Sequence, residues 1–100
     1  MKKNELIEIL QGHWLSKSEG PFAIAIAGEE IIYDSYSKKT FFTLSENKDK
    51  IDETDADWNI TVDEFNWKDS PLKIINDAEF IISENPGLNL KLFIFRKQIR

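Results

Sequence analysis

The sequence lacks cysteine altogether, and its 100 residues include one histidine, three prolines and four glycines. The absence of cysteine excludes disulfides, thiolate metal sites and thiol nucleophiles, and agrees with a reducing compartment. The single histidine, His13, cannot supply both the acid and the base of a two-histidine hydrolytic site. No phosphate-cradling glycine loop and no Gly-x-Ser-x-Gly elbow is present. We therefore expect a protein that is not an enzyme and needs no cofactor.

Long apolar runs are also missing. No stretch approaches the ~20 residues that a membrane-spanning helix needs. Lys2 and Lys3 imitate the start of a signal peptide, but Glu5 and Glu8 interrupt the apolar region that should follow them. We expect no membrane association and a cytoplasmic location. The length and the 41% hydrophobic content predict a single domain over residues 1–100.

The net charge of −5 is concentrated in the middle of the chain. Nine acidic residues and only three lysines lie between positions 46 and 69. A nucleic-acid-binding surface needs the opposite sign, because much of its affinity comes from neutralising phosphates. Direct binding of DNA or RNA is therefore disfavoured.

Four side chains of this acidic stretch have the spacing of the first, third, fifth and ninth positions of a calcium-binding loop: Asp55, Asp57, Asn59 and Asp63. Ile60 stands where that loop needs glycine, and Asn66 stands where it needs a bidentate glutamate. The segment also has the two-residue periodicity of a strand. We expect no metal site.

The chain opens with a predicted helix over about 4–11. Leu6, Ile7 and Leu10 form an apolar stripe at helical spacing, Asn4 is a candidate N-cap, and Gly12 ends the helix.

After the helix the apolar period changes to two, which predicts eight short strands. Their approximate ranges are 14–16, 22–27, 31–33, 40–44, 58–63, 72–75, 80–82 and 88–97. A turn at 85–87 would precede the last of them. Closure of such a meander removes its two exposed edges, so we expect a mainly β fold: a short helix, then a small barrel over about 12–98. A small sandwich, or a cone-shaped sheet closed by the helix, is the alternative.

The segment Gly12-His13-Trp14, at the start of the first strand, resembles the Gly-x-Trp signature of the lipocalin and fatty-acid-binding superfamily. In that superfamily the tryptophan lies at the closed end of the barrel, and an arginine near the end of the last strand packs across it. The resemblance therefore implies that Arg96 stacks on Trp14. It also implies a carrier of a hydrophobic ligand.

Closure of the barrel would pair the first strand with the last. With Arg96 facing inward, Leu92 and Ile94 would also face inward, while Phe93 and Phe95 would lie outside beneath the helix or in a weak dimer contact. The candidate inward set consists of Trp14, Phe22, Ile24, Ile26, Phe42, Trp58, Ile60, Val62, Phe80, Ile82, Leu90 and Leu92. Such bulky groups should leave little cavity, which argues against the carrier.

Aromatic residues are interleaved with the acids of the central stretch. The candidate partner-binding residues are Glu46, Asp49, Asp52, Glu53, Asp55, Asp57, Asp63, Glu64, Phe65, Trp67 and Asp69. Here Trp67 or Phe65 would be an apolar anchor inside an acidic field that attracts a basic protein. In size, charge and type, the chain resembles the small barrel-type immunity proteins of bacterial contact-dependent growth inhibition systems. The resemblance implies a monomer or weak dimer that inhibits a basic protein toxin, such as a nuclease, by covering its active site.

Overall fold

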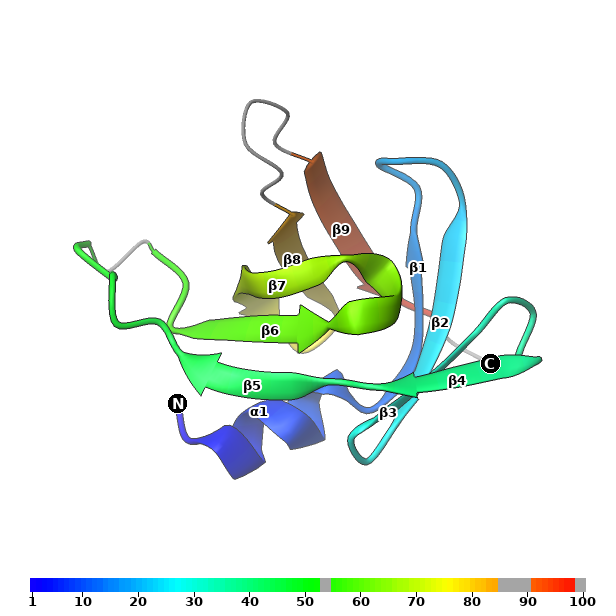
Figure 1. The fold of residues 1–100 in the computed structure, drawn as a ribbon, viewed down its shortest axis with the longest axis horizontal. Helices are drawn as coiled ribbons and strands as arrows, with labels where there is room; N and C mark the ends of the chain where they lie inside the picture. The colour runs from blue at the N-terminus through cyan, green and yellow to red at the C-terminus, as the bar shows by residue number, and fades with distance from the viewer. Residues whose placement is uncertain (53–54, 85–90, 99–100) are drawn as a thin grey trace.

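The computed structural model describes residues 1–52, 55–84 and 91–98. In these ranges one helix is followed by nine antiparallel strands that form a small, nearly closed barrel (Figure 1). The elements are α1 (Lys3–Leu10), β1 (Gly12–Ser16), β2 (Phe22–Ala27), β3 (Glu30–Tyr33), β4 (Lys38–Phe41), β5 (Thr43–Glu46), β6 (Trp58–Val62), the 3-10 helix η1 (Asp63–Phe65), β7 (Trp67–Asn76), β8 (Glu79–Glu84) and β9 (Lys91–Lys97). The mainly β class is confirmed. No helix in the described ranges is long and apolar enough to cross a membrane.

The barrel closes through a single bent segment of chain. Hydrogen-bonded neighbours follow the order β4-β3-β2-β1-β9-β8-β7-β6-β5, and only Phe42 separates the two strands at its ends. The Phe42 N–H donates to the Glu29 carbonyl beside β3, and the next residue, Thr43, pairs with Thr61 of β6. The segment therefore pairs with β3 through its first half and with β6 through its second. The predicted eight strands are found, with the fourth divided in two at Phe42.

Helix α1 covers one end of the barrel (Figure 1). Leu6 and Leu10 are fully buried, and the Trp14 indole N–H donates to the Leu10 carbonyl over 2.8 Å. The prediction of Asn4 as the N-cap is wrong, because the helix begins at Lys3. The observed N-cap residue is Lys2, which makes no side-chain capping hydrogen bond. Asn4 lies inside the first turn. Packing of the apolar stripe against the barrel therefore holds this helix in place.

The polar end of the helix is fixed to the turn between β2 and β3. The Gln11 Oε1 accepts a hydrogen bond from the Gly28 N–H at 2.7 Å, and its Nε2 donates to the Gly28 carbonyl at 3.0 Å. Gly28 has φ +64°, a left-handed conformation that glycine adopts without steric cost. The contact between Gln11 and this turn sets the position of the helix over the barrel.

Aromatic rings fill the interior along a continuous line. Trp14 contacts Phe80 at 4.5 Å between ring centroids, Phe80 stacks on Phe95 at 5.0 Å, Phe95 lies 6.0 Å from Phe22, and Phe22 meets Phe65 edge-to-face at 5.1 Å. Aliphatic residues complete the core: Leu6, Leu10, Ile24, Ile26, Ile31, Leu44, Ile60, Val62, Leu72 and Ile82. The line of rings begins at the helix-covered end and leads to the other end. It occupies the space in which a carrier would hold its ligand.

The two faces of β9 are the reverse of those expected. Phe95 is fully buried and Phe93 packs against the core, whereas Leu92 is exposed and the Arg96 side chain is 75% exposed. The register pairs Trp14 with position 97, so the Lys97 ammonium group lies over the Trp14 ring, 5.4 Å from its centroid. The helix covers a barrel end and not an outer face.

The reversal has a simple physical cause. Neighbouring residues of a strand face opposite sides of the sheet, and both sides of this strand are apolar, so the alternation alone does not choose between them. The predicted inward residue Leu90, the strand start at Leu88 and the turn at 85–87 lie outside the described residues.

Candidate functional site

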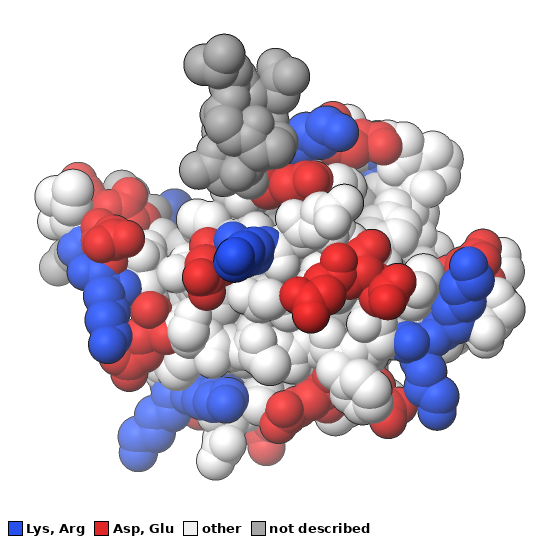
Figure 2. Space-filling model, in the orientation of Figure 1, with Lys and Arg blue, Asp and Glu red and all other residues white. Residues whose placement is uncertain are grey.

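The acidic segment, residues 46–69, extends from the end of β5 through the following loop, β6 and η1 to the start of β7. Acidic side chains are scattered over the face formed by these elements, with lysines between them (Figure 2). Every described acid of the segment is exposed: Glu46, Asp49, Asp52, Asp55, Asp57, Asp63, Glu64 and Asp69. Glu53 lies outside the described residues. The segment therefore presents its charge to solvent, where it can act on an approaching partner.

Asp55 shapes the loop between β5 and β6. Its Oδ2 accepts hydrogen bonds from the backbone N–H groups of Ile51 and Asp52, both at 3.1 Å. These two bonds favour the ionised form and lower the pKa of the Asp55 carboxyl. The base of the loop is closed by Asn47, whose N–H donates to the Asp57 carbonyl at 2.9 Å. Asp55 is thus a structural residue of the loop as well as a charge on it.

Asp57 forms an ion pair with Lys50 across the same loop. The hydrogen bond from the lysine is the main cause of the lowered pKa of the Asp57 carboxyl. The acids of the segment therefore divide into two kinds. Asp55 holds the loop through its backbone and Asp57 through Lys50, whereas Glu46, Asp49 and the acids of η1 make no such side-chain contact to the loop among the described residues.

An open groove of about 420 Å³ lies beside the loop. Its lining residues are Asn47, Asp49, Asp55, Ala56, Asn59, Lys68, Asp69 and Pro71. The Asp69 N–H donates to Thr61 Oγ1 at 2.9 Å, and the residue takes a left-handed φ of +46°. Three predicted carboxylates from the loop and from β7 thus border one groove. Asp63 and Glu64, which lie on η1, are not among the lining residues.

Ile51 is an exposed apolar residue that the sequence reasoning missed. Its side chain is 95% exposed, the highest value among the large exposed hydrophobic residues. It lies between Lys50 and Asp52, and Asp55 binds its backbone. The sequence did contain a signal for its exposure, because Ile51 is an isoleucine in a charged stretch and has no apolar neighbours at alternating positions.

Of the two predicted aromatic anchors, Trp67 is buried and Phe65 is partly exposed. Trp67 is 1% exposed because it begins β7, pairs with Val62 and packs 5.4 Å from the Phe93 ring. Phe65 is half-buried, with its ring 5.0 Å from both Trp67 and Tyr33. The expectation of a desolvated aromatic anchor is therefore wrong for Trp67. Both rings belong to the core at the end of the barrel away from the helix.

His13 lies on the outer surface. Its Nδ1 is 3.2 Å from the Tyr36 hydroxyl, and the two rings meet edge-to-face. The turn that carries Tyr36 has left-handed φ values at Asp34, Ser35 and Tyr36. The contact links this turn to β1.

Within residues 1–52, 55–84 and 91–98, no three carboxylate or histidine side chains come together as a metal-ligand set. In particular, Asp55 and Asp57 lie in the loop, Asn59 lies on β6 and Asp63 begins η1. The spacing of a calcium loop is therefore not accompanied by its geometry.

Comparisons with known proteins add no relative. No protein-family model matches the chain, and searches of curated proteins and of solved structures found no significant match. Function is accordingly argued from the geometry of this chain.

Proposed function

We propose that this protein is a non-enzymatic inhibitor that binds a basic protein through its acidic segment. The observation that carries the proposal is Ile51, 95% exposed on a loop that Asp55 holds through two backbone hydrogen bonds. An exposed apolar side chain surrounded by charge of one prevailing sign is the arrangement of a small protein-binding surface, with an apolar contact inside a polar rim.

The two parts of this surface would act at different stages of binding. The exposed carboxylates attract a basic partner over several ångströms and raise the association rate, by ~10-fold or more at low salt. Ile51 then loses water against the partner and slows dissociation. The groove beside Asp49, Asp55 and Asp69 can receive a lysine or arginine side chain.

The class of partner follows from this chemistry. A nuclease binds phosphates with basic residues, so carboxylates placed against those residues occupy the positions of the phosphates. We accordingly propose an immunity protein that neutralises a toxin of this kind. The likeness to contact-dependent growth inhibition immunity proteins in size, charge and barrel type supports this part of the proposal.

A lipocalin-like carrier is the second candidate. Trp14 at the helix-covered end, with a cation over its ring, supports a relationship to that superfamily, although the cation is Lys97 and not Arg96. The line of aromatic rings from Trp14 to Phe65 argues against a ligand inside the barrel. We therefore favour the inhibitor.

The test begins with capture of partners from a lysate of the native organism, using the protein as bait and quantitative mass spectrometry. Three baits are compared with the unmodified chain. One is Ile51→Ser, one combines Glu46→Gln, Asp49→Asn and Asp52→Asn, and the third is the control Ile75→Ser, which changes an exposed isoleucine of β7 outside the segment. The set spares Asp55, so the loop keeps its shape.

We expect a basic protein on the unmodified and control baits, and its loss or strong depletion on the other two. The captured protein is then purified, and its association rate and its enzymatic activity are measured with and without the bait at two salt concentrations. Equal capture by all four baits would refute the proposed surface, as would a partner whose activity the bound protein does not reduce.

A further inference from the structure

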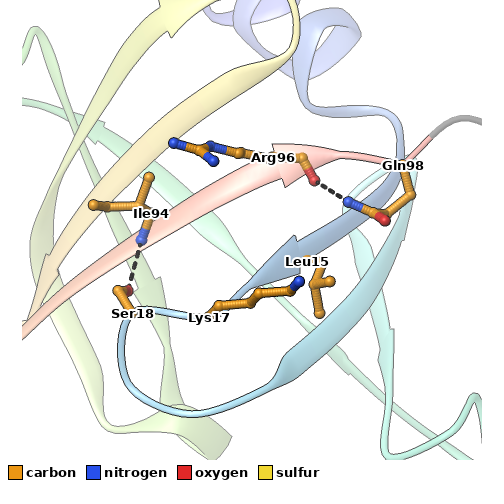
Figure 3. Close-up of a pocket in the computed structure, with 6 residues that line it drawn as sticks. All are labelled: Leu15, Lys17, Ser18, Ile94, Arg96 and Gln98. Atoms are coloured by element: carbon orange, nitrogen blue, oxygen red, sulfur yellow. Dashed lines mark hydrogen bonds between the residues drawn. The ribbon is translucent and has the colours of Figure 1, made fainter.

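A second surface site lies on the outside of the barrel, where β1 meets β9. It is an open pocket of about 390 Å³, within the size range of small-molecule sites. Its lining residues are Leu15, Lys17, Ser18, Ile94, Arg96 and Gln98. Figure 3 shows Arg96 along one side and Lys17 along the other, with Ile94 and Leu15 at opposite ends between them. Apolar and cationic groups thus alternate around one pocket.

Strand register produces this alternation. Leu15 pairs with Arg96 across the β1–β9 ladder, so the two side chains are direct neighbours on the outer face. Ile94 precedes Arg96 by two residues on β9 and therefore shares its face. The outward orientation of Arg96, which differs from the sequence expectation, is what creates the pocket.

Ser18 lies just after the end of β1 and connects it to the backbone of β9. Its hydroxyl donates to the Leu92 carbonyl at 2.6 Å and accepts from the Ile94 N–H at 3.2 Å. The side chain thereby satisfies two backbone groups of β9 beyond the point where β1 pairs with it. These hydrogen bonds consequently fix the position of Ser18, one of the lining residues, against β9.

The charge of the pocket is opposite to that of the whole chain. The protein has a net charge of −5, yet the described residues that line the pocket include two cations and no carboxylate. Arg96 pairs with Glu79 on β8, which accepts from the arginine Nε at 3.1 Å. This bond leaves the terminal amino groups of the guanidinium available to a ligand. Lys17 has no ion-pair partner within the described part of the chain.

We infer that this pocket binds a small organic carboxylate with a short apolar chain. The two cations that line the pocket, Arg96 and Lys17, attract the carboxylate, and Gln98, whose Nε2 already donates to the Arg96 carbonyl at 3.1 Å, has a second amide hydrogen to donate. The apolar chain covers Leu15 and Ile94. The site is outside the barrel and on other strands than the acidic segment, so it does not depend on the proposed inhibitor function.

Octanoate is a suitable probe, because it is an anion at neutral pH with a flexible apolar chain. Titration at constant ionic strength is followed by NMR through the Leu15 and Ile94 methyl groups and the backbone amides. We expect saturable shifts at these residues with a Kd of about a millimolar or tighter. Octanol tests the apolar part alone, and inorganic phosphate tests the charge alone. Both should bind at least about fivefold more weakly than octanoate.

Single substitutions test the contributions of the two cations, Lys17 and Arg96, separately. Lys17→Gln and Arg96→Gln should each weaken octanoate binding about threefold to tenfold, whereas Lys48→Gln, a change of an exposed lysine in the acidic segment, should leave it unchanged. Glu79→Gln should tighten binding, because it removes the carboxylate that competes for Arg96. This opposite direction is not expected of a variant that merely disturbs the fold.

Several results would overturn the inference. They are the absence of saturation, shifts confined to core residues, equal affinity for octanol, and indifference to both cation substitutions. Tighter binding of a tripeptide that ends in a free apolar residue would assign the pocket to a peptide C-terminus and would equally refute the small-molecule assignment.

Discussion

Replacement of Trp67 by alanine distinguishes between two roles of this residue, a buried member of the core and a partner-binding anchor on the surface. The side chain is 1% exposed and its ring lies within 6.4 Å, centroid to centroid, of four other aromatic rings. Truncation of such a residue to alanine removes buried apolar area and leaves a cavity, which costs about 3–5 kcal/mol. For a domain of this size each kilocalorie lowers the melting temperature by roughly 4–8 °C. We expect Trp67→Ala to lower it by about 15 °C or more, or to prevent folding.

Chemical denaturation followed by circular dichroism measures this change, with Ile51→Ala as the exposed control. The control should stay within about 0.5 kcal/mol of the unmodified protein. Trp67→Phe supplies a foldable variant. It removes a buried indole N–H that has no hydrogen-bond partner among the described residues, so relief of about 1–3 kcal/mol opposes the loss of packing. Equal stability of Trp67→Ala and Ile51→Ala would refute the assignment of Trp67 to the core.

Three further predictions concern the surface. Arg96→Ala should cost only about 0.5 kcal/mol in urea unfolding, because the exposed pair with Glu79 contributes little; a loss above 1.5 kcal/mol would restore the stacked arrangement on the tryptophan. The Asp55 carboxyl has a lower pKa in the folded protein than in the unfolded protein. Its contribution to stability is therefore fully present at pH values above the unfolded-state pKa, and it is lost as the pH falls through the lower folded-state pKa. The amide NMR signals of Ile51 and Asp52 should therefore titrate at a lower pH than they would beside an unperturbed aspartate, and Asp55→Asn should abolish that titration. Calcium or zinc at micromolar concentration should leave the melting temperature unchanged, and a saturable rise would reveal a ligand set.

Most strand positions could be read from the sequence because an alternating apolar pattern is bounded by turn residues, although the structure has nine strands where eight were expected. Ile24 and Ile26 alternate with alanines before Gly28, and that strand is found where expected. The division at Phe42 was not predictable in this way. Thr40, Phe42 and Leu44 keep the same alternation through the change of partner from β3 to β6, so only long-range pairing reveals the bend.

Sequence periodicity failed where both faces of a strand are apolar. On β9, Phe95 and not Arg96 faces inward because its ring packs against other aromatic rings inside the barrel. Of those rings, Phe80 comes from the neighbouring strand β8, where it pairs directly with Phe95, and Phe22 comes from β2. The same limitation explains Trp67, which sits among acids in the sequence but joins the interior because η1 returns the chain toward the core. The interior therefore follows from tertiary packing that local pattern does not contain.

The acids of the candidate site were predictable as exposed groups, but their separate roles were not. Charge density alone does not distinguish Asp55, which binds two backbone N–H groups, from Asp49 on the same loop. Ile51 was overlooked because an isolated apolar residue predicts neither a strand nor a helix. Its exposure becomes informative only when the loop around it has a defined conformation.

How the barrel closes also limits how a partner can bind. A free sheet edge offers backbone groups to an incoming strand, and proteins reduce this risk with short, charged edge strands. Here the two ends of the sheet are halves of one bent segment, each four residues long, with Lys38 and Lys39 on β4 and Glu46 on β5. Strand addition is therefore disfavoured at both ends. Since aromatic rings fill the interior, both of the binding sites that we propose use side chains of the outer surface: Ile51 with its acids in one, and Arg96 with Lys17 in the other.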